Sequence, residues 1–120
     1  MGHNSGKLTT HVLDTARGKP ADGMSIRLYQ IQGPSKNLLL ETTTNHDGRC
    51  SAPLLEGATL KKGTYELLFL VKPYFHGFTG VAAEPFLDEV PIRFTVGDDK
   101  VHYHIPLLVS PWSYSTYRGS

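Results

Sequence analysis

Short segments in which apolar and polar residues alternate at every second position recur along this chain, and they constrain its fold more than any other feature. The run Val-Pro-Ile-Arg-Phe-Thr-Val at residues 90–96 is one of them. Successive side chains of a β-strand point to opposite faces, so this period predicts strands with one buried face. We expect strands over residues 7–14, 24–32, 38–44, 64–71, 90–96, 101–109 and 112–117, and a further short strand near residues 49–52.

Turn-forming residues separate these segments, as the Asp47-Gly48 pair does after residues 38–44. Seven or eight short strands with such spacing are typical of an all-β sandwich or barrel and not of a parallel α/β sheet. Residues 64–71 carry apolar side chains on both faces, so we expect both faces of this strand to be covered. Residues 72–80 lack the alternation, and we expect a short helix or a loop there.

The chain has 120 residues, a length that suits one domain with a core of its own. Its first six residues contain no apolar stretch of the kind found in signal peptides. We therefore expect residues 1–6 to form a flexible N-terminal tail and residues 7–120 to form a single β-sandwich domain.

The composition argues against several classes of partner. A net charge of +1 provides no basic field for nucleic acid or an anionic membrane. No apolar run approaches the ~20 residues needed to cross a bilayer. Cys50 is the only cysteine, which rules out an intramolecular disulfide and favours a reducing, cytoplasmic location.

Three of the six histidines fall inside expected strands, where they could carry chemistry. Histidine is suited to proton transfer at neutral pH because its ordinary pKa is near 6.5. His102 and His104 are two residues apart, so their side chains leave the same face of one strand, and His11 lies in the middle of another. The other three histidines fall in the expected tail, in a turn and in residues 72–80, where a solvated side chain is ordinary.

Two kinds of site fit this pattern. A zinc site could use the His-x-His pair and a third histidine, although the spacing of that third ligand is not a recognisable one and Cys50 has no partner motif. A metal-free hydrolase could instead use neutral imidazoles to handle a water, with Arg49 supplying positive charge where an oxyanion develops. Strand histidines and a strand-end arginine are also ordinary solvated residues, so spacing alone leaves the site open.

The last nine residues are rich in aromatic and hydroxyl side chains. Chain ends usually fray. An end of this composition could instead dock on a strand and place Tyr117, Ser120 and the terminal carboxylate near a ligand. No Ser–His–Asp or nucleophilic-cysteine signature surrounds Ser120 or Cys50, so neither is expected to act as a covalent nucleophile.

Three longer motifs carry more information than these spacings. They are Leu-Thr-Thr-His-Val-Leu-Asp-Thr at residues 8–15, continuing to Gly-Lys-Pro-Ala at 18–21; Thr-Asn-His-Asp-Gly-Arg at 44–49; and His-Tyr-His-Ile-Pro-Leu-Leu-Val-Ser-Pro at 102–111, running into Ser-Tyr-Ser-Thr-Tyr-Arg-Gly-Ser at 113–120. Together and in this order they resemble the 5-hydroxyisourate hydrolases, the enzymatic branch of the transthyretin-like proteins. The likeness extends from about residue 7 to residue 120, and the terminal Tyr-Arg-Gly-Ser resembles the tetrapeptide that distinguishes this branch from true transthyretins.

The resemblance implies a transthyretin-like (prealbumin-like), eight-stranded β-sandwich with one short helix, near residues 72–80. It also implies a homotetramer, a dimer of dimers with active sites in a channel between the dimers, and an enzyme that needs no metal or cofactor. The family's catalytic positions fall on His11, Arg49, His104 and Ser120, and all four match in residue type. Its substrate contacts fall on His11, Arg49, Tyr117 and Ser120, while His102 is expected to be a supporting or neutral residue.

The implied reaction is the hydrolysis of 5-hydroxyisourate, the product of urate oxidation in purine degradation. Water would open the six-membered ring at its cyclic amide and form 2-oxo-4-hydroxy-4-carboxy-5-ureidoimidazoline. His11 and His104 would orient and deprotonate the water and return the proton to the leaving nitrogen, although the sequence does not decide which one is the base. Three alternatives stay open: a transthyretin-type carrier of small aromatic ligands, a zinc hydrolase and a purely structural sandwich module.

Overall fold

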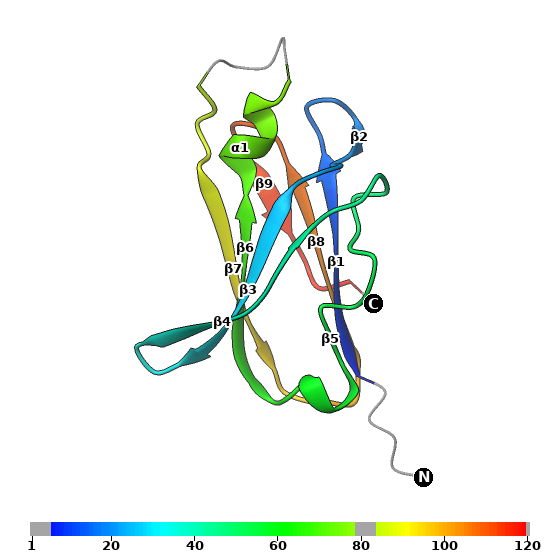
Figure 1. Cartoon of the computed structure of the whole chain (residues 1–120), viewed down its shortest axis with the longest axis vertical. Helices are drawn as coiled ribbons and strands as arrows, with labels where there is room; N and C mark the ends of the chain where they lie inside the picture. Colours follow the sequence, from blue (N-terminus) through cyan, green and yellow to red (C-terminus); the bar gives the residue numbers. More distant parts are fainter. Residues whose placement is uncertain (1–5, 79–83, 120) are drawn as a thin grey trace.

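The computed structural model describes residues 6–78 and 84–119, and it shows two β-sheets packed face to face (Figure 1). One sheet contains β2 (Lys19–Pro20), β1 (Lys7–Asp14), β8 (His102–Val109) and β9 (Tyr114–Thr116) in that order, with β5 (Leu55–Glu56) paired to the other end of β1. The second sheet contains β4 (Ser35–Thr43), β3 (Ser25–Gln32), β6 (Gly63–Leu70) and β7 (Glu89–Val96). A 3-10 turn, η1 (Gly57–Thr59), and one short helix, α1 (Val71–His76), complete the elements of these residues. The expected β-sandwich with one short helix is confirmed.

The long strands lie where the alternation predicts them, and the short ones differ. The expected strand at residues 7–14 is β1 with the same bounds, whereas the strand expected at 112–117 shortens to β9. The strand expected near 49–52 is a single bridge between Arg49 and His11. The described residues contain nine strands instead of eight, since β2 and β5 are two residues long and too short to show a period.

Strand β6 is covered on both faces, as its apolar pattern predicts. Tyr65 to Phe69 are all buried, with Tyr65, Leu67 and Phe69 in the core between the sheets. On the opposite face the carboxylate of Glu66 accepts ion pairs from Lys36 at 2.7 Å and Arg93 at 3.2 Å. Because β6 lies between β3 and β7, cross-strand neighbours within one chain are enough to cover this face.

Strands β1 and β8 run parallel, and their pairing determines what can meet on the outside of the sheet. Thr9 lies opposite His104, and His11 lies opposite Pro106. Burial alternates strictly along β1, so Lys7, Thr9, His11 and Leu13 face outward and are half-buried. The outward face of this pair therefore carries His11, His102 and His104, the three strand histidines that the sequence marks as candidates for chemistry.

Helix α1 occupies part of the segment expected at residues 72–80, and the last two residues of that segment lie outside the described residues. The helix is attached to β1 by a buried hydrogen bond, in which the Tyr74 hydroxyl donates to the Asp14 carboxylate at 2.8 Å. Gly6, expected in the tail, is buried and its carbonyl accepts a bond from Gly57, while residues 1–5 lie outside the described part. Within residues 6–78 and 84–119, no helix is long and apolar enough to span a bilayer.

The turn before Arg49 requires glycine at position 48. Gly48 has a φ of +74°, and a Cβ added there would lie 2.3 Å from the carbonyl oxygen of Val12. The Gly48 carbonyl in turn accepts a hydrogen bond of 2.8 Å from the Val12 amide. This close approach joins the turn to β1.

Gly48→Ala should therefore lower the free energy of unfolding by about 2 kcal/mol or more, because it adds both left-handed strain and a backbone clash. Chemical denaturation followed by circular dichroism measures the change. Gly97→Ala is the matched control, since nothing lies within 4 Å of a Cβ at that position. Equal stability of the two variants would contradict the role assigned to Gly48.

Candidate active site

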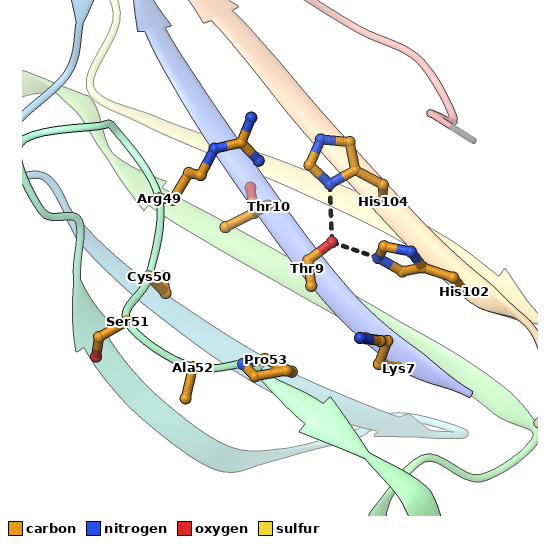
Figure 2. A pocket seen from close by; sticks show the side chains of 10 residues that line it. All are labelled: Lys7, Thr9, Thr10, Arg49, Cys50, Ser51, Ala52, Pro53, His102 and His104. Atoms are coloured by element: carbon orange, nitrogen blue, oxygen red, sulfur yellow. Dashed lines mark hydrogen bonds between the residues drawn. The ribbon is translucent and has the colours of Figure 1, made fainter. Parts of the chain in front are cut away.

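The hydroxyl of Thr9 joins two imidazoles on the outer face of the β1–β8 pair. Its Oγ1 lies 2.6 Å from Nε2 of His102 and 2.8 Å from Nδ1 of His104. Figure 2 shows these two hydrogen bonds as dashed lines. The two rings belong to alternate residues of β8 and lie 6.1 Å apart between centroids. His104 is half-buried and His102 is exposed. The His-x-His pair therefore lies on one face, as its spacing predicts.

Arg49 reaches this face from the turn that follows β4. The side-chain oxygen of Asn45 accepts bonds from the amides of Asp47 and Arg49 at 2.9 and 3.2 Å, which fixes the turn. The backbone of Arg49 then bridges to His11. None of the ion pairs found among the described residues involves Arg49, so its guanidinium is available to a ligand. Hydrogen bonds to the backbone of Arg49, and no ion pair of its guanidinium among the described residues, hold this residue at the site.

The pKa of His104 lies below its ordinary value, chiefly because the ring is partly buried. The positive charge of Arg49 lowers it further, and so do His102 and His11. The pKa of His11 is also lowered, first by burial and then by Arg49, although a hydrogen bond with the backbone of Asp47 opposes the shift. Both imidazoles are therefore neutral at pH 7, the form in which a ring nitrogen can accept a proton.

A pocket of about 420 Å³ opens beside these groups. Cys50 lines it, but burial raises the pKa of this thiol, so the thiolate is disfavoured and the residue is poorly suited to nucleophilic attack. His11 is not among the lining residues, although its charge acts on His104. The residues that line the pocket are Lys7, Thr9, Thr10, Arg49, Cys50, Ser51, Ala52, Pro53, His102 and His104.

The C-terminal segment returns to His104. The Gly119 amide donates to the His104 carbonyl at 2.7 Å, and a Cβ at Gly119 would lie 2.7 Å from Cδ2 of the His104 ring. Only a residue without a side chain fits so closely against this imidazole. Ser120, the expected catalytic residue that follows, lies outside the described residues.

Tyr117 does not join the histidines in this chain. It is 61% exposed and lines a separate, largely apolar groove of about 260 Å³ with Ile92 and Phe94. Beside it, the guanidinium of Arg118 lies 4.4 Å from the centroid of the Tyr103 ring. The sequence thus predicts the meeting of His11, Arg49 and His104, and it misses Thr9 and Lys7, whose position on the outward face of β1 was the available signal.

Across residues 6–78 and 84–119, no three His, Cys, Asp or Glu side chains lie close enough to hold a metal ion. His11, His102 and His104 share the face but do not converge on one point. The arrangement fits chemistry in which neutral imidazoles transfer protons and a fixed cation stabilises developing negative charge.

Comparison with known proteins gives consistent matches. The sequence profile of the HIUase/Transthyretin family matches residues 8–119. The 5-hydroxyisourate hydrolase of Deinococcus radiodurans is 59% identical over 113 residues, which cover 94% of this chain and 95% of the relative.

Two solved structures are similar over nearly the whole chain. Klebsiella pneumoniae 5-hydroxyisourate hydrolase has a TM-score of 0.77 and 33% identity, covering 95% of this chain and 99% of that one. (S)-allantoin synthase has a TM-score of 0.89 and 47% identity, covering 97% of this chain but only 44% of the synthase chain. This chain therefore spans less than half of the synthase and is close to the full length of the Klebsiella enzyme.

Replacing Arg49 with glutamine should raise the pKa of both His11 and His104, because a positive charge that disfavours protonation is removed. The pKa of His104 should stay below 6.5, since burial and the other two histidines still act on it. Titration of the imidazole signals by NMR measures both values. Arg49→Lys keeps the charge and should leave them near those of the wild type.

Arg118→Gln is the matched control for this titration, since it removes an arginine that contacts Tyr103 and not the histidines. If Arg49→Gln and Arg118→Gln shift the pKa values of the two histidines equally, the assigned electrostatic contact is wrong.

The lowered pKa values of His11 and His104 also predict that the free energy of unfolding falls as the pH drops below about 6.5. In that range the unfolded chain binds protons more readily than the folded one.

Proposed function

This chain belongs to the HIUase/Transthyretin family and is a 5-hydroxyisourate hydrolase, and we propose that it opens its substrate with His11, Arg49, His104 and Ser120. The expected transthyretin-like sandwich is confirmed by the same comparisons. The observation that carries the proposed site is the meeting of two imidazoles of lowered pKa with the guanidinium of Arg49, which forms no ion pair within residues 6–78 and 84–119, on one face of β1 and β8.

In the proposed reaction a water attacks the ring carbonyl carbon of 5-hydroxyisourate. One of His11 and His104 takes the proton of that water, and the carbonyl oxygen gains negative charge close to Arg49. The carbon–nitrogen bond of the cyclic amide then breaks, and the leaving nitrogen takes a proton from an imidazolium. Water is thus added across one bond, no covalent enzyme intermediate forms, and no cofactor is needed.

The pocket has the size and lining expected for such a substrate. Its volume of about 420 Å³ lies in the range of small-molecule sites, and Lys7 and Arg49 give it two positive groups for an anionic, urate-like ring. We propose that Ser120 and Tyr117 form hydrogen bonds to ring substituents. Because Tyr117 lies outside the pocket of its own chain, its contact requires a neighbouring chain to bring a pocket next to it.

We also propose a homotetramer, a dimer of dimers with the sites in a channel between the dimers. Supporting this, the outward face of β1 carries half-buried groups, and Trp112, Tyr114 and Tyr117 at the end of the chain are large and exposed. Sedimentation equilibrium would report the mass of the assembly.

A cytoplasmic location is proposed because Cys50 is the only cysteine of the sequence and is free.

The direct test generates 5-hydroxyisourate in situ from urate with a urate oxidase and follows its ultraviolet decay. The wild-type protein should accelerate the decay, and treatment with a chelator should leave the rate unchanged. His11→Asn and His104→Asn should each lower kcat roughly 10²- to 10⁴-fold, because each removes a proton-transfer group. His76→Asn, an exposed residue at the end of α1, is the matched control.

Near-wild-type turnover in both His11→Asn and His104→Asn would contradict the assignment of these residues to the catalytic site. A rate that collapses on chelation and returns with zinc would favour the zinc hydrolase instead. Unchanged decay with the wild-type protein would contradict the activity itself.

Deleting residues 117–120 separates the enzyme from a carrier of the same fold. The deletion should lower kcat more than about 100-fold, since it removes Ser120 and the Gly119 contact with His104. Strand β9 ends at Thr116, so circular dichroism should show an intact sandwich. Full activity in a folded deletion variant would exclude any role for the terminal segment.

A further inference from the structure

The Thr9 hydroxyl contacts two histidines at the candidate site, and the proposed mechanism assigns it no role. It lies between two imidazoles, with Nε2 of His102 at 2.6 Å and Nδ1 of His104 at 2.8 Å. The parallel register explains this position, since Thr9 is the Cα partner of His104 and His102 is one strand repeat away on the same face. Figure 2 shows the threonine oxygen between the two rings.

A hydroxyl carries one proton, which limits the arrangements at this contact. If Thr9 donates to one ring nitrogen, that nitrogen must be bare. The nitrogen of the other ring must then carry a proton and donate to the threonine oxygen. While both rings are neutral, the protons of His102 and His104 are therefore coupled through one oxygen atom.

We propose that Thr9 is a positioning residue that holds His104 as the general base of the hydrolase reaction. In the arrangement we assign, His104 donates from Nδ1 to Thr9, and Thr9 donates to Nε2 of His102. Nε2 of His104, on the opposite edge of the ring, is then bare and accepts the proton of the attacking water. This inference rests on the proposed function. It assigns the base to His104, which lines the pocket, whereas the lowered pKa that His104 shares with His11 does not distinguish the two rings.

The charges that face His104 explain why a hydroxyl suits this position. Lys7 from β1 and Arg49 from the turn are cations, the pKa of the His11 imidazole is lowered by burial, and Cys50 is a thiol whose pKa is raised by burial. No carboxylate belongs to the described residues that line the pocket. An aspartate at position 9 would raise the pKa of His104 and attract Arg49 away from the substrate. A hydroxyl orients the ring without adding negative charge.

The position of the ring proton can be observed without measuring activity. In protein labelled with ¹⁵N-histidine, long-range ¹H–¹⁵N spectra separate a protonated ring nitrogen from a bare one, and His102→Asn and His104→Asn assign the signals. Above the pKa of both rings, the wild type should show His104 protonated on Nδ1 and bare on Nε2. Thr9→Val should give a mixture of both tautomers, and Thr9→Ser should restore the wild-type spectrum.

Thr116→Val is the matched control for this experiment. It removes another threonine hydroxyl that donates to β8, at the carbonyl of Pro106 and 2.8 Å away, but it lies away from the two histidines. Its spectrum should match the wild type. A wild-type His104 that is bare on Nδ1, or a Thr9→Val spectrum that does not change, would overturn the proposal.

The kinetic arm separates positioning from a structural role. Thr9→Val should lower kcat roughly tenfold to a hundredfold, as two hydrogen bonds are lost, with a much smaller change in KM. Thr9→Ser should recover kcat to within about threefold. Equal losses in the valine and serine variants would mean that the methyl group, and not the hydroxyl, matters.

The two proposals fail in different ways. If the wild-type protein does not accelerate the decay of 5-hydroxyisourate, the assigned function is wrong. The tautomer of His104 can still be determined from the NMR spectrum. If the wild type is active and Thr9→Val is equally active, the function stands and the positioning role of Thr9 is wrong. Denaturation curves of each variant confirm that the comparison is made on folded protein.

Discussion

The parallel pairing of β1 and β8 is the constraint on which the rest of the site depends. It places Thr9 opposite His104 and His11 opposite Pro106. The side chains of Thr9, His11, His102 and His104 therefore lie on the same face of the sheet. The inner faces of the same two strands supply core residues such as Leu8, Val12 and Leu107. A shift of one residue in this register would exchange the two faces and bury the imidazoles in an apolar core. Packing of the core therefore fixes the geometry of the chemistry.

Backbone contacts complete the arrangement from outside the pair. The turn at residues 45–48 brings Arg49 to β1 through the Val12–Gly48 bond, and Gly119 attaches the end of the chain to His104. Thr9 and His104 are 95 positions apart in the sequence. The site is therefore absent from any partly folded chain in which the last long strand has not yet docked, since closing such a loop precedes the contact.

Much of this arrangement could be predicted from sequence because it depends on local periodicity and on motifs. The alternation gives β1 its bounds, the two-residue spacing places His102 and His104 on one face, and Asp47-Gly48 marks the turn before Arg49. The two-residue strands β2 and β5 have no period to detect. The parallel register could not be predicted either, because it depends on contacts between residues almost a hundred positions apart. For that reason the contact of Thr9 with both histidines emerges only from the structure.

The pocket has Lys7 and Arg49 at its wall and no carboxylate among its described lining residues, on a chain whose net charge is only +1. Two cationic side chains thus line the pocket while the molecule as a whole is nearly neutral. A cleft of this kind accelerates diffusional encounter with anions, and dissolved salt weakens the effect over roughly 10 Å at 0.1 M ionic strength. For a short-lived anionic substrate, capture before spontaneous decay then depends on the ionic strength of the surroundings as well as on turnover.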